Sequence, residues 1–303
     1  MFKILIVGKN RPGIAVSTEV WEQYGFRQNG ATCDMLNILD ERGGALTSRQ
    51  IIAKMNLLGG YDAVMYYAVF DPDVIRATKR VAAKSANVTF DALLVHGEEK
   101  LRLFLECSDM VDFTFHTGGV PQCKKAIRVM QGCEPLLGLV RPQERSFGRP
   151  VFVGNFQNGR SKSLKDFLLG NGIDVLGDSG KNRYFRQDLF NLCHQRSVMV
   201  ALHRLPDGYT IYDYPGYWSN RVYVTTGYAG CVLHPYCVGM DLEFEPDKEI
   251  VLYGSYDELL EKANALHKDN ELCRHIAENA YIRSRSEHTY KNRTKKILDA
   301  LKQ

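Results

Sequence analysis

Short apolar runs alternate with amphipathic segments along the first half of the chain. The apolar runs predict strands at 2–7, 33–39, 63–70, 92–96 and 111–115. The segments between them predict helices at 18–28, 47–58, 72–83 and 119–130. Alternation of this kind is typical of a parallel sheet that carries helices on both faces.

The pattern breaks at the polar segment 139–148 and then begins again. Strands are predicted at 150–154, 173–177, 197–202, 231–234 and 250–253. Helices are predicted at 164–169, 187–193, 219–228, 256–267 and 271–287. We therefore predict an α/β protein with two Rossmann-like αβα domains that face each other across a cleft. Ligands of open parallel sheets bind beyond the carboxyl ends of the strands, so the loops after the strands should line this cleft.

Composition agrees with two globular domains. The 303 residues are 45% hydrophobic and 24% charged, and this length suits two domains of about 150 residues. The eight cysteines form no C-x-x-C pair, and the opening MFKILIVG is too short for a signal peptide. No apolar run approaches the roughly 18 residues that cross a bilayer. We expect a cytoplasmic protein in a reducing compartment.

Charge adds little to this interpretation. The formal net charge of +4 does not require a polyanionic partner. Residues 281–303 nevertheless hold an excess of Lys and Arg. This excess is either the solvated face of a terminal helix or a surface that meets phosphate or a membrane.

The most informative segment is 217–235, YWSNRVYVTTGYAGCVLHP, which an acidic segment at 239–249 follows. It predicts a short helix with Ser219 as N-cap, closed near Gly227 and Gly230 and followed by a buried strand. Free N–H groups and the helix dipole favour phosphate at such an N-terminus, and Arg221 adds a forked cation. The segment indicates a site for a nucleoside diphosphate.

Two further loops follow predicted strands. The loop at 155–163 presents Arg160 and Lys162, which either bind phosphate oxygens or are ordinary solvated charges. In the loop at 8–17, Gly13 permits close approach of a ligand to the backbone, and Glu19 opens the next helix. Both loops lack G-x-G-x-x-G, the dinucleotide-binding fingerprint.

Histidines end two predicted strands, and an Asp-Pro-Asp sequence precedes a helix. His96 and His116 either bind a sugar hydroxyl or phosphate, or cap their strands. Asp71-Pro72-Asp73 has the spacing of a metal-binding D-x-D, but an Asp cap followed by Pro at the first helical position explains it fully.

Three segments carry a family resemblance, in this order: YWSNRVYVTTGYAGCVLH, then GMDLEFEPDKEIVLYGSYDELLEKA, then SEHTYKNRTKKIL. On these segments, the stretch from about 152 to 290 resembles the donor-binding domain of GT-B-fold glycosyltransferases. The resemblance is to the glycosyl transferases group 1 type, in its spore-maturation-protein-like branch. It implies domains at 1–145 and 146–286, with a final helix at 287–303 that crosses back onto the N-terminal domain.

The resemblance also implies the site and its substrates. The donor is a nucleotide sugar, with no cofactor besides it and no metal. The residues implied at its diphosphate are Arg160, Lys162, Ser219, Asn220 and Arg221. The sugar or nucleotide contacts implied are Gly13, Tyr217, Glu243 and Glu245. His96 faces the transferred sugar, and Glu19 lies where the acceptor enters.

One position departs from the family pattern. Relatives carry a Glu that holds the ribose within the helix after the Arg, and here the position is Val224. The ribose contact would then come from Glu243 or Glu245, or donor binding would be weaker.

We therefore expect a glycosyltransferase that moves a sugar to a hydroxyl of a glycan, lipid or small molecule. A retaining reaction needs only that the acceptor be positioned against the leaving phosphate, and the related group favours this outcome. An inverting reaction needs a general base, Glu19 or His96. The alternatives are a transferase for a modified DNA base, a non-catalytic nucleotide-sugar-binding protein, and another doubly wound enzyme such as an epimerase.

Overall fold

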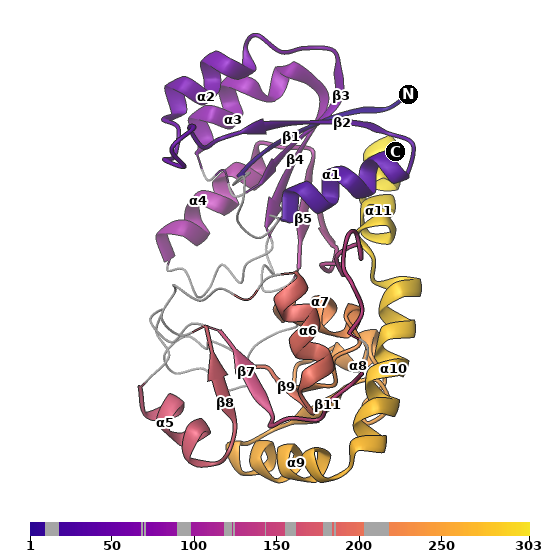
Figure 1. Ribbon diagram of the computed structural model, residues 1–303. Coiled ribbons are helices and arrows are strands. Elements are labelled where there is room, and N and C mark those ends of the chain that lie inside the picture. The colour runs from indigo at the N-terminus through magenta and orange to yellow at the C-terminus, as the bar shows by residue number, and fades with distance from the viewer. Residues whose placement is uncertain are drawn as a thin grey trace. The chain divides into compact units, whose positions relative to one another are not determined.

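The computed structural model divides the chain into two compact units. It describes residues 1–9, 18–67, 69, 71–89, 98–117, 123, 125–142, 144–154, 162–177, 184, 186–202 and 218–303. Unit 1 is Met1–Gln131 with Tyr290–Gln303, and unit 2 is Gly132–Thr289 (Figure 1). Residues 132–145, which we assigned to the first domain from sequence, thus lie in unit 2.

Unit 1 is built on a six-stranded sheet in the order β2-β1-β3-β4-β5-β6, and all its strand pairs are parallel. Its strands are β1 (Lys3–Gly8), β2 (Thr32–Asn37), β3 (Tyr61–Tyr67), β4 (Ala82–Thr89), β5 (Phe113–His116) and β6 (Ala126–Arg128). Its helices are α1 (Thr18–Gln28), α2 (Ser48–Met55), α3 (Pro72–Thr78), the 3-10 turn η1 (Lys79–Val81), α4 (Glu98–Asp109) and α11 (Tyr290–Lys302).

Alternate residues of the strands enter two separate cores, because successive side chains of a strand point to opposite faces of the sheet. Ile4 and Ile6 of β1 pack in a cluster with Phe26 of α1 and Ile297 of α11. Leu5 and Val7 pack in a second cluster with residues of α2, α3 and α4. Helices therefore cover both faces of the sheet, as the alternation of elements predicted.

Two of the short helices have capped N-termini. Thr47 and Gln50 form a reciprocal capping box at the start of α2. The Asp71 side chain accepts hydrogen bonds from the N–H groups of Asp73 and Val74, with Pro72 at the first helical position of α3. The cap explanation of Asp-Pro-Asp is therefore confirmed, and its carboxylate is already in use.

Strand β4 is the element that the sequence pattern missed. We expected a helix through residue 83 and a helix at 119–130; instead 82–89 is a strand and 126–128 a short strand, and 98–109 is a helix that we did not predict. The strand expected at 92–96 lies outside the described residues. Strand β4 was missed because it is central and fully paired yet carries polar residues. Ser85 is hydrogen-bonded to Asp112, and Asn87 to Ser108 at 3.1 Å. Because these partners satisfy the hydrogen bonds of Ser85 and Asn87, the two polar side chains can be buried in the strand. The partners are distant in the sequence, so the local pattern of apolar residues does not reveal them.

Unit 2 repeats the architecture with a five-stranded parallel sheet in the order β11-β10-β9-β7-β8. Its strands are β7 (Val151–Val153), β8 (Asp174–Leu176), β9 (Met199–Val200), β10 (Val232–Pro235) and β11 (Val251–Tyr253). Its helices are α5 (Lys162–Gly170), α6 (Gln187–Gln195), α7 (Arg221–Gly227), α8 (Met240–Glu243), α9 (Tyr256–Lys268) and α10 (Asn270–Glu287).

The final helix, α11, packs within unit 1, so the expected return of the chain to the N-terminal domain is confirmed. A Cβ atom on Gly25 of α1 would come within 2.5 Å of the Tyr290 carbonyl oxygen, so only glycine allows this close helix contact. None of the described helices is long and apolar enough to cross a membrane.

Candidate functional site

Helix α7 is buried along its length and partly open only at its start. Every residue from 222 to 230 is buried, whereas Ser219, Asn220 and Arg221 are half-buried. Because α7 precedes β10 and runs antiparallel to it, this open turn lies at the carboxyl edge of the sheet. The edge is where ligands of open parallel sheets bind.

The first turn of α7 differs in detail from the sequence prediction. The helix begins at Arg221, its N-cap residue is Asn220, and the Asn220 side chain makes no cap hydrogen bond. Asn220 already has helical backbone angles, so the hydroxyl of Ser219 instead accepts the Arg221 N–H at 3.3 Å. The Val222 N–H donates to the Ser219 carbonyl at 3.2 Å. These two N–H groups are therefore satisfied within the turn, and Arg221 contributes the positive charge of this turn through its side chain.

The Arg221 guanidinium lies over the Phe152 ring of β7, 5.5 Å from its centroid. It also acts on His234 of β10, whose pKa burial and then Arg221 lower to about 4. His234 is fully buried, and its Nδ1 lies 2.6 Å from the Pro235 carbonyl oxygen. The histidine is thus neutral at pH 7, and the positive charge here belongs to Arg221.

Lys162 is the first residue of α5 and is exposed. It makes no ion pair with the part of the chain that the structure describes. Its place just after β7 puts it at the same edge of the sheet as Arg221. Arg160 and Tyr217, which we also expected here, lie outside the described residues.

Glu243 belongs to a hydrogen-bonded group at this edge. Its Oε2 accepts the Tyr223 hydroxyl at 3.1 Å, and the same hydroxyl accepts the Trp218 Nε1–H at 3.0 Å. His288 of the α10 end lies 3.4 Å from this carboxylate oxygen. The rings of Tyr223, Phe244 and His288 pack against one another. Glu243 is therefore held by the protein itself.

Glu245 lies two residues further on and is separate from this group. It forms an exposed ion pair with Lys248, and its N–H donates to Glu249 at 2.8 Å. Its carboxylate thus closes a surface turn, whose Asp247 has a φ of 61°.

In unit 1, Glu19 lies at the carboxyl edge of the sheet, in the first turn of α1. Its Oε1 accepts the Lys9 N–H at 3.4 Å. A Cβ atom on Gly8 would come 3.0 Å from Glu19 Cγ and 3.1 Å from Tyr67 Cβ, so Gly8 lets this side chain lie over the ends of β1 and β3. Gly13 and His96 lie outside the described residues.

His116 ends β5 as the sequence predicted. Burial, and then Arg128, lower its pKa. Its Nδ1 is buried and has no hydrogen-bond partner in the described part of the chain.

Comparisons with known proteins agree with this architecture. Residues 162–299 match the glycosyl transferase-like family. Three solved structures superpose along the whole chain. Sucrose-phosphate synthase from Thermosynechococcus elongatus has a TM-score of 0.70 at 9% identity, covering 100% of this chain and 98% of its own. An alpha-glucosyltransferase in complex with UDP has a TM-score of 0.68 at 10% identity, with 100% of both chains covered. Anabaena HepE in complex with UDP and glucose has a TM-score of 0.67 at 14% identity, again with full coverage.

The chain has the GT-B fold of the glycosyltransferases. A further structure of the alpha-glucosyltransferase holds UDP and a 13-mer DNA with a central A:G mismatch. Comparison with curated protein sequences gives no match. The narrower resemblance to the spore-maturation-like branch stays a prediction.

Two features of unit 2 could not be expected from the sequence segments that carry the family resemblance. Val224, the position aligned with the family's Glu, is buried in a cluster with Val151, Phe190 and Met199. A side chain there points into the core and not toward the open turn. Tyr223 and His288 were not singled out, although the quoted segments contain both. Their role depends on Glu243, which is distant from both in the sequence and meets them only in the folded protein.

Proposed function

We propose that the protein transfers a sugar from a nucleoside-diphosphate sugar to a hydroxyl acceptor. Arg221 carries the proposal: it is a half-buried cation in the first turn of a helix that is otherwise buried, at the carboxyl edge of a parallel sheet. It lies within the segment that matches the glycosyl transferase-like family. UDP, found in several structures of this fold, is the nucleotide to test first.

The reaction requires stabilisation of the leaving diphosphate, where negative charge builds as the glycosidic bond breaks. Fixed cations at that position contribute the largest stabilising effect in such sites. We assign this role to Arg221 and Lys162, and to Arg160, which lies outside the described residues. The proposal includes a retaining, metal-independent reaction, in which the acceptor is positioned against the leaving phosphate. If the outcome is inverting instead, Glu19 or His96 is the general base.

Glu243 is proposed as the ribose contact, since the site of the family's Glu is buried. The Glu243 side chain is partly exposed, at 24% of its surface area. Tyr223 and His288 both contact Oε2, and we assign Oε1 to a ribose hydroxyl. Glu245 is less suited, because it would have to leave its ion pair with Lys248. Gly13 and Tyr217 remain proposed sugar or nucleotide contacts.

The first experiment measures thermal stabilisation by UDP, GDP, ADP, CMP and TDP and by their sugar conjugates. A ligand at a hundredfold excess over its Kd stabilises the folded protein by about 2.7 kcal/mol. Arg221→Gln should remove the shift, whereas Arg274→Gln, an exposed arginine of α10, should keep it. If none of the nucleotides shifts the transition of the wild type, the transferase proposal fails.

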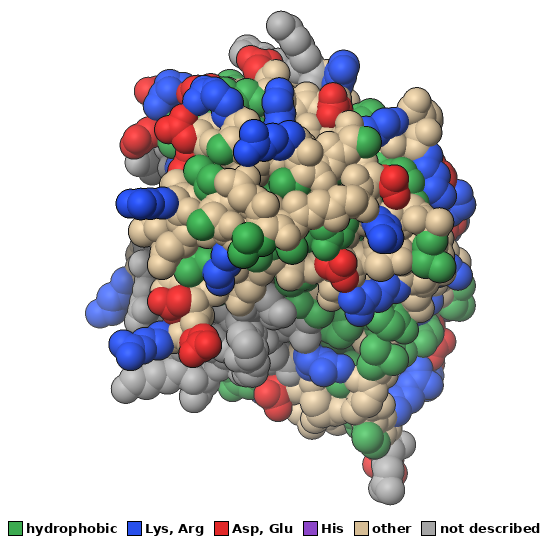
Figure 2. Space-filling model, turned by 90° about the horizontal axis from the view of Figure 1, so that it is seen from above, with side chains coloured by type: hydrophobic (Ala, Val, Ile, Leu, Met, Phe, Trp, Pro, Cys, Tyr) green, Lys and Arg blue, Asp and Glu red, His purple; other side chains and the backbone are tan. Residues whose placement is uncertain are grey.

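A transferase for a modified DNA base is a second candidate, because one structure of the same fold holds DNA together with UDP. The face of the molecule shown in Figure 2 does not form a broad basic surface, since its Lys and Arg side chains are spread among Asp, Glu and apolar side chains. In the basic C-terminal run, moreover, Arg293 is buried and Arg285 is bound to the Gly227 and Glu134 carbonyls. Salt-sensitive binding of a DNA duplex would favour this candidate.

Turnover separates the enzyme from a non-catalytic binding protein. Release of nucleoside diphosphate with glycan, lipid or small-molecule hydroxyl acceptors indicates an enzyme. Donor binding without turnover on any acceptor indicates a binding protein. All eight cysteines are unpaired thiols, and this supports the proposed cytoplasmic location.

A further inference from the structure

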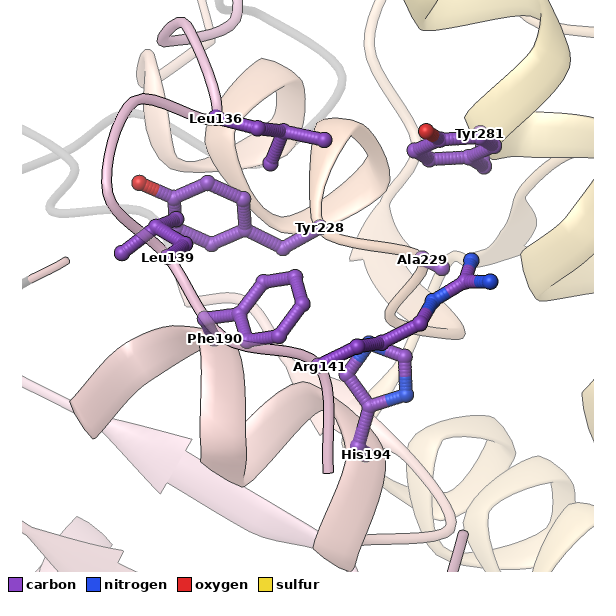
Figure 3. A pocket seen from close by; sticks show the side chains of 8 residues that line it. All are labelled: Leu136, Leu139, Arg141, Phe190, His194, Tyr228, Ala229 and Tyr281. Carbon is purple, nitrogen blue, oxygen red and sulfur yellow. The ribbon is translucent and has the colours of Figure 1, made fainter. Parts of the chain in front are cut away.

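A cavity of about 340 Å³ lies in unit 2 near the C-terminal end of α7 (Figure 3). Tyr228 and Ala229, which follow α7, line it together with Phe190 and His194 of α6 and Tyr281 of α10. The open turn with Arg221 is at the other end of the same seven-residue helix, about 10 Å away along its axis. The cavity is therefore separate from the proposed donor site.

Aromatic rings form one wall of the cavity and are held in place. Phe190 meets Tyr228 edge to face, with 5.5 Å between ring centroids, and lies 4.7 Å from the His194 ring. The Tyr228 hydroxyl donates to Glu134 Oε2 at 2.5 Å. This bond fixes the Tyr228 ring and occupies the Glu134 carboxylate. In Figure 3 the Tyr281 ring lies across the cavity from Phe190 and Tyr228.

A cation stands at the edge of this aromatic wall. Arg141 lines the cavity, is exposed, and forms no ion pair with the described part of the chain. His194 is buried, and its pKa is lowered to about 4 by burial and then by Arg145 and Arg141. The neutral imidazole therefore leaves the guanidinium of Arg141 as the charged group of the wall. The Nε2 atom of His194 is buried and makes no hydrogen bond with the described residues.

The carboxylates nearby do not cancel this charge. Glu134 is engaged by Tyr228, and Glu278 is exposed and acts on Arg145. The eight side chains of the wall include no carboxylate. A ligand with one negative charge and a flat apolar body matches this combination of rings and guanidinium.

We propose that this cavity binds a small aromatic monocarboxylate, with the carboxylate on Arg141 and the rings between Tyr281 and the Phe190–Tyr228 wall. The volume is at the lower end of the range of small-molecule sites, which suits one or two fused rings. The proposal does not depend on sugar transfer, because it uses none of the residues assigned to the donor.

The test uses 2-naphthoate and its neutral analogue, 2-naphthamide, as probes of the full-length protein. Binding is followed by saturation-transfer NMR and by titration calorimetry. We expect saturable binding of 2-naphthoate, at least about tenfold tighter than that of the amide, since a hydrogen bond between ionised groups is stronger than one between neutral groups. Arg141→Gln should remove the preference for the acid. Arg42→Gln, an exposed arginine of unit 1, should leave it unchanged.

A second variant tests the place of binding. Leu136 borders the cavity and is 36% exposed, so Leu136→Trp should fill the opening without disturbing the core. We expect this variant to lose the probe and to keep its unfolding transition. Equal affinity for acid and amide, no saturable binding at millimolar probe, or unchanged binding in Leu136→Trp would each overturn the proposal. Displacement of the probe by UDP would also overturn it, because the probe would then occupy the donor site.

Discussion

Arg293 of α11 forms an ion pair with Glu22 of α1, and the two side chains are 3% and 0% exposed. The other oxygen of Glu22 accepts the Tyr67 hydroxyl from β3. Arg293 also donates to the Met130 carbonyl at 2.6 Å. Helix α11 is thus bonded to helix α1, to strand β3 of the sheet and to Met130, near the end of the first segment of unit 1.

Arg293→Met should destabilise unit 1 strongly. It leaves the Glu22 carboxylate buried without its cation, and breaking a buried pair from one side costs about 3–5 kcal/mol. Urea unfolding followed by circular dichroism measures the loss. The double variant Glu22→Gln with Arg293→Met should recover a large part of it, because no buried charge remains. A single variant as stable as the wild type would show that the pair does not hold α11 in place.

Stability should depend on pH through Glu22. Burial, as the largest cause, raises the pKa of this carboxyl from 4.5 to about 7, against the opposing effect of Arg293. The folded protein then binds more protons than the unfolded chain between these values. The contribution to the free energy of unfolding is therefore fully present below about pH 4.5 and is lost as pH rises to about 7. Unfolding curves from pH 4 to 8 should show a smaller fall in Glu22→Gln than in the wild type. Glu41→Gln, an exposed control, should follow the wild type; identical curves for all three proteins would contradict the assignment.

The Tyr223 hydroxyl connects Trp218 with Glu243, so Tyr223→Phe should affect both. Trp218 is 1% exposed, and its Nε1–H would lose the hydrogen bond to this hydroxyl. Loss of a buried hydrogen bond costs about 1–3 kcal/mol. We expect a lower unfolding midpoint together with weaker binding of UDP, because Glu243 also loses a donor. Phe244→Leu, which alters the same aromatic cluster without touching a hydrogen bond, is the control: it should lower the midpoint and spare the UDP affinity. Loss of stability with unchanged UDP affinity in Tyr223→Phe would remove Glu243 from the donor site.

The architecture was predictable because apolar periodicity reports burial directly. The helix at 18–28 and the strands at 173–177 and 231–234 were each located to within one or two residues. Strand β4 was not, because its polar residues depend on partners such as Asp112 that come from elsewhere in the chain. The end of α7 shows a similar limit. It ends at Gly227, as expected, yet the residue with a positive φ after it is Ala229, with a φ of 59°, and not a glycine.

The site was predictable only as far as single residues follow from local chemistry. The open turn with Arg221 follows from its own sequence. The group of Trp218, Tyr223, Glu243 and His288 does not, since three elements of unit 2 bring its members together. Distances between such groups are set by tertiary packing, which local patterns do not encode.

Restoring the family's Glu at position 224 should not improve donor binding. Val224 is 7% exposed and packs with Val151, Phe190 and Met199. Val224→Glu would bury a carboxylate without a partner, which costs several kcal/mol or forces the group to take up a proton. We expect a lower unfolding midpoint and no gain in UDP affinity, whereas the smaller change Val224→Ala should cost less and leave UDP affinity unchanged. Calorimetric titration of UDP at a temperature where all three proteins are folded separates the two effects. A Val224→Glu protein that is stable and binds UDP more tightly would show that this side chain reaches the donor, and the ribose contact would then return to α7 from Glu243.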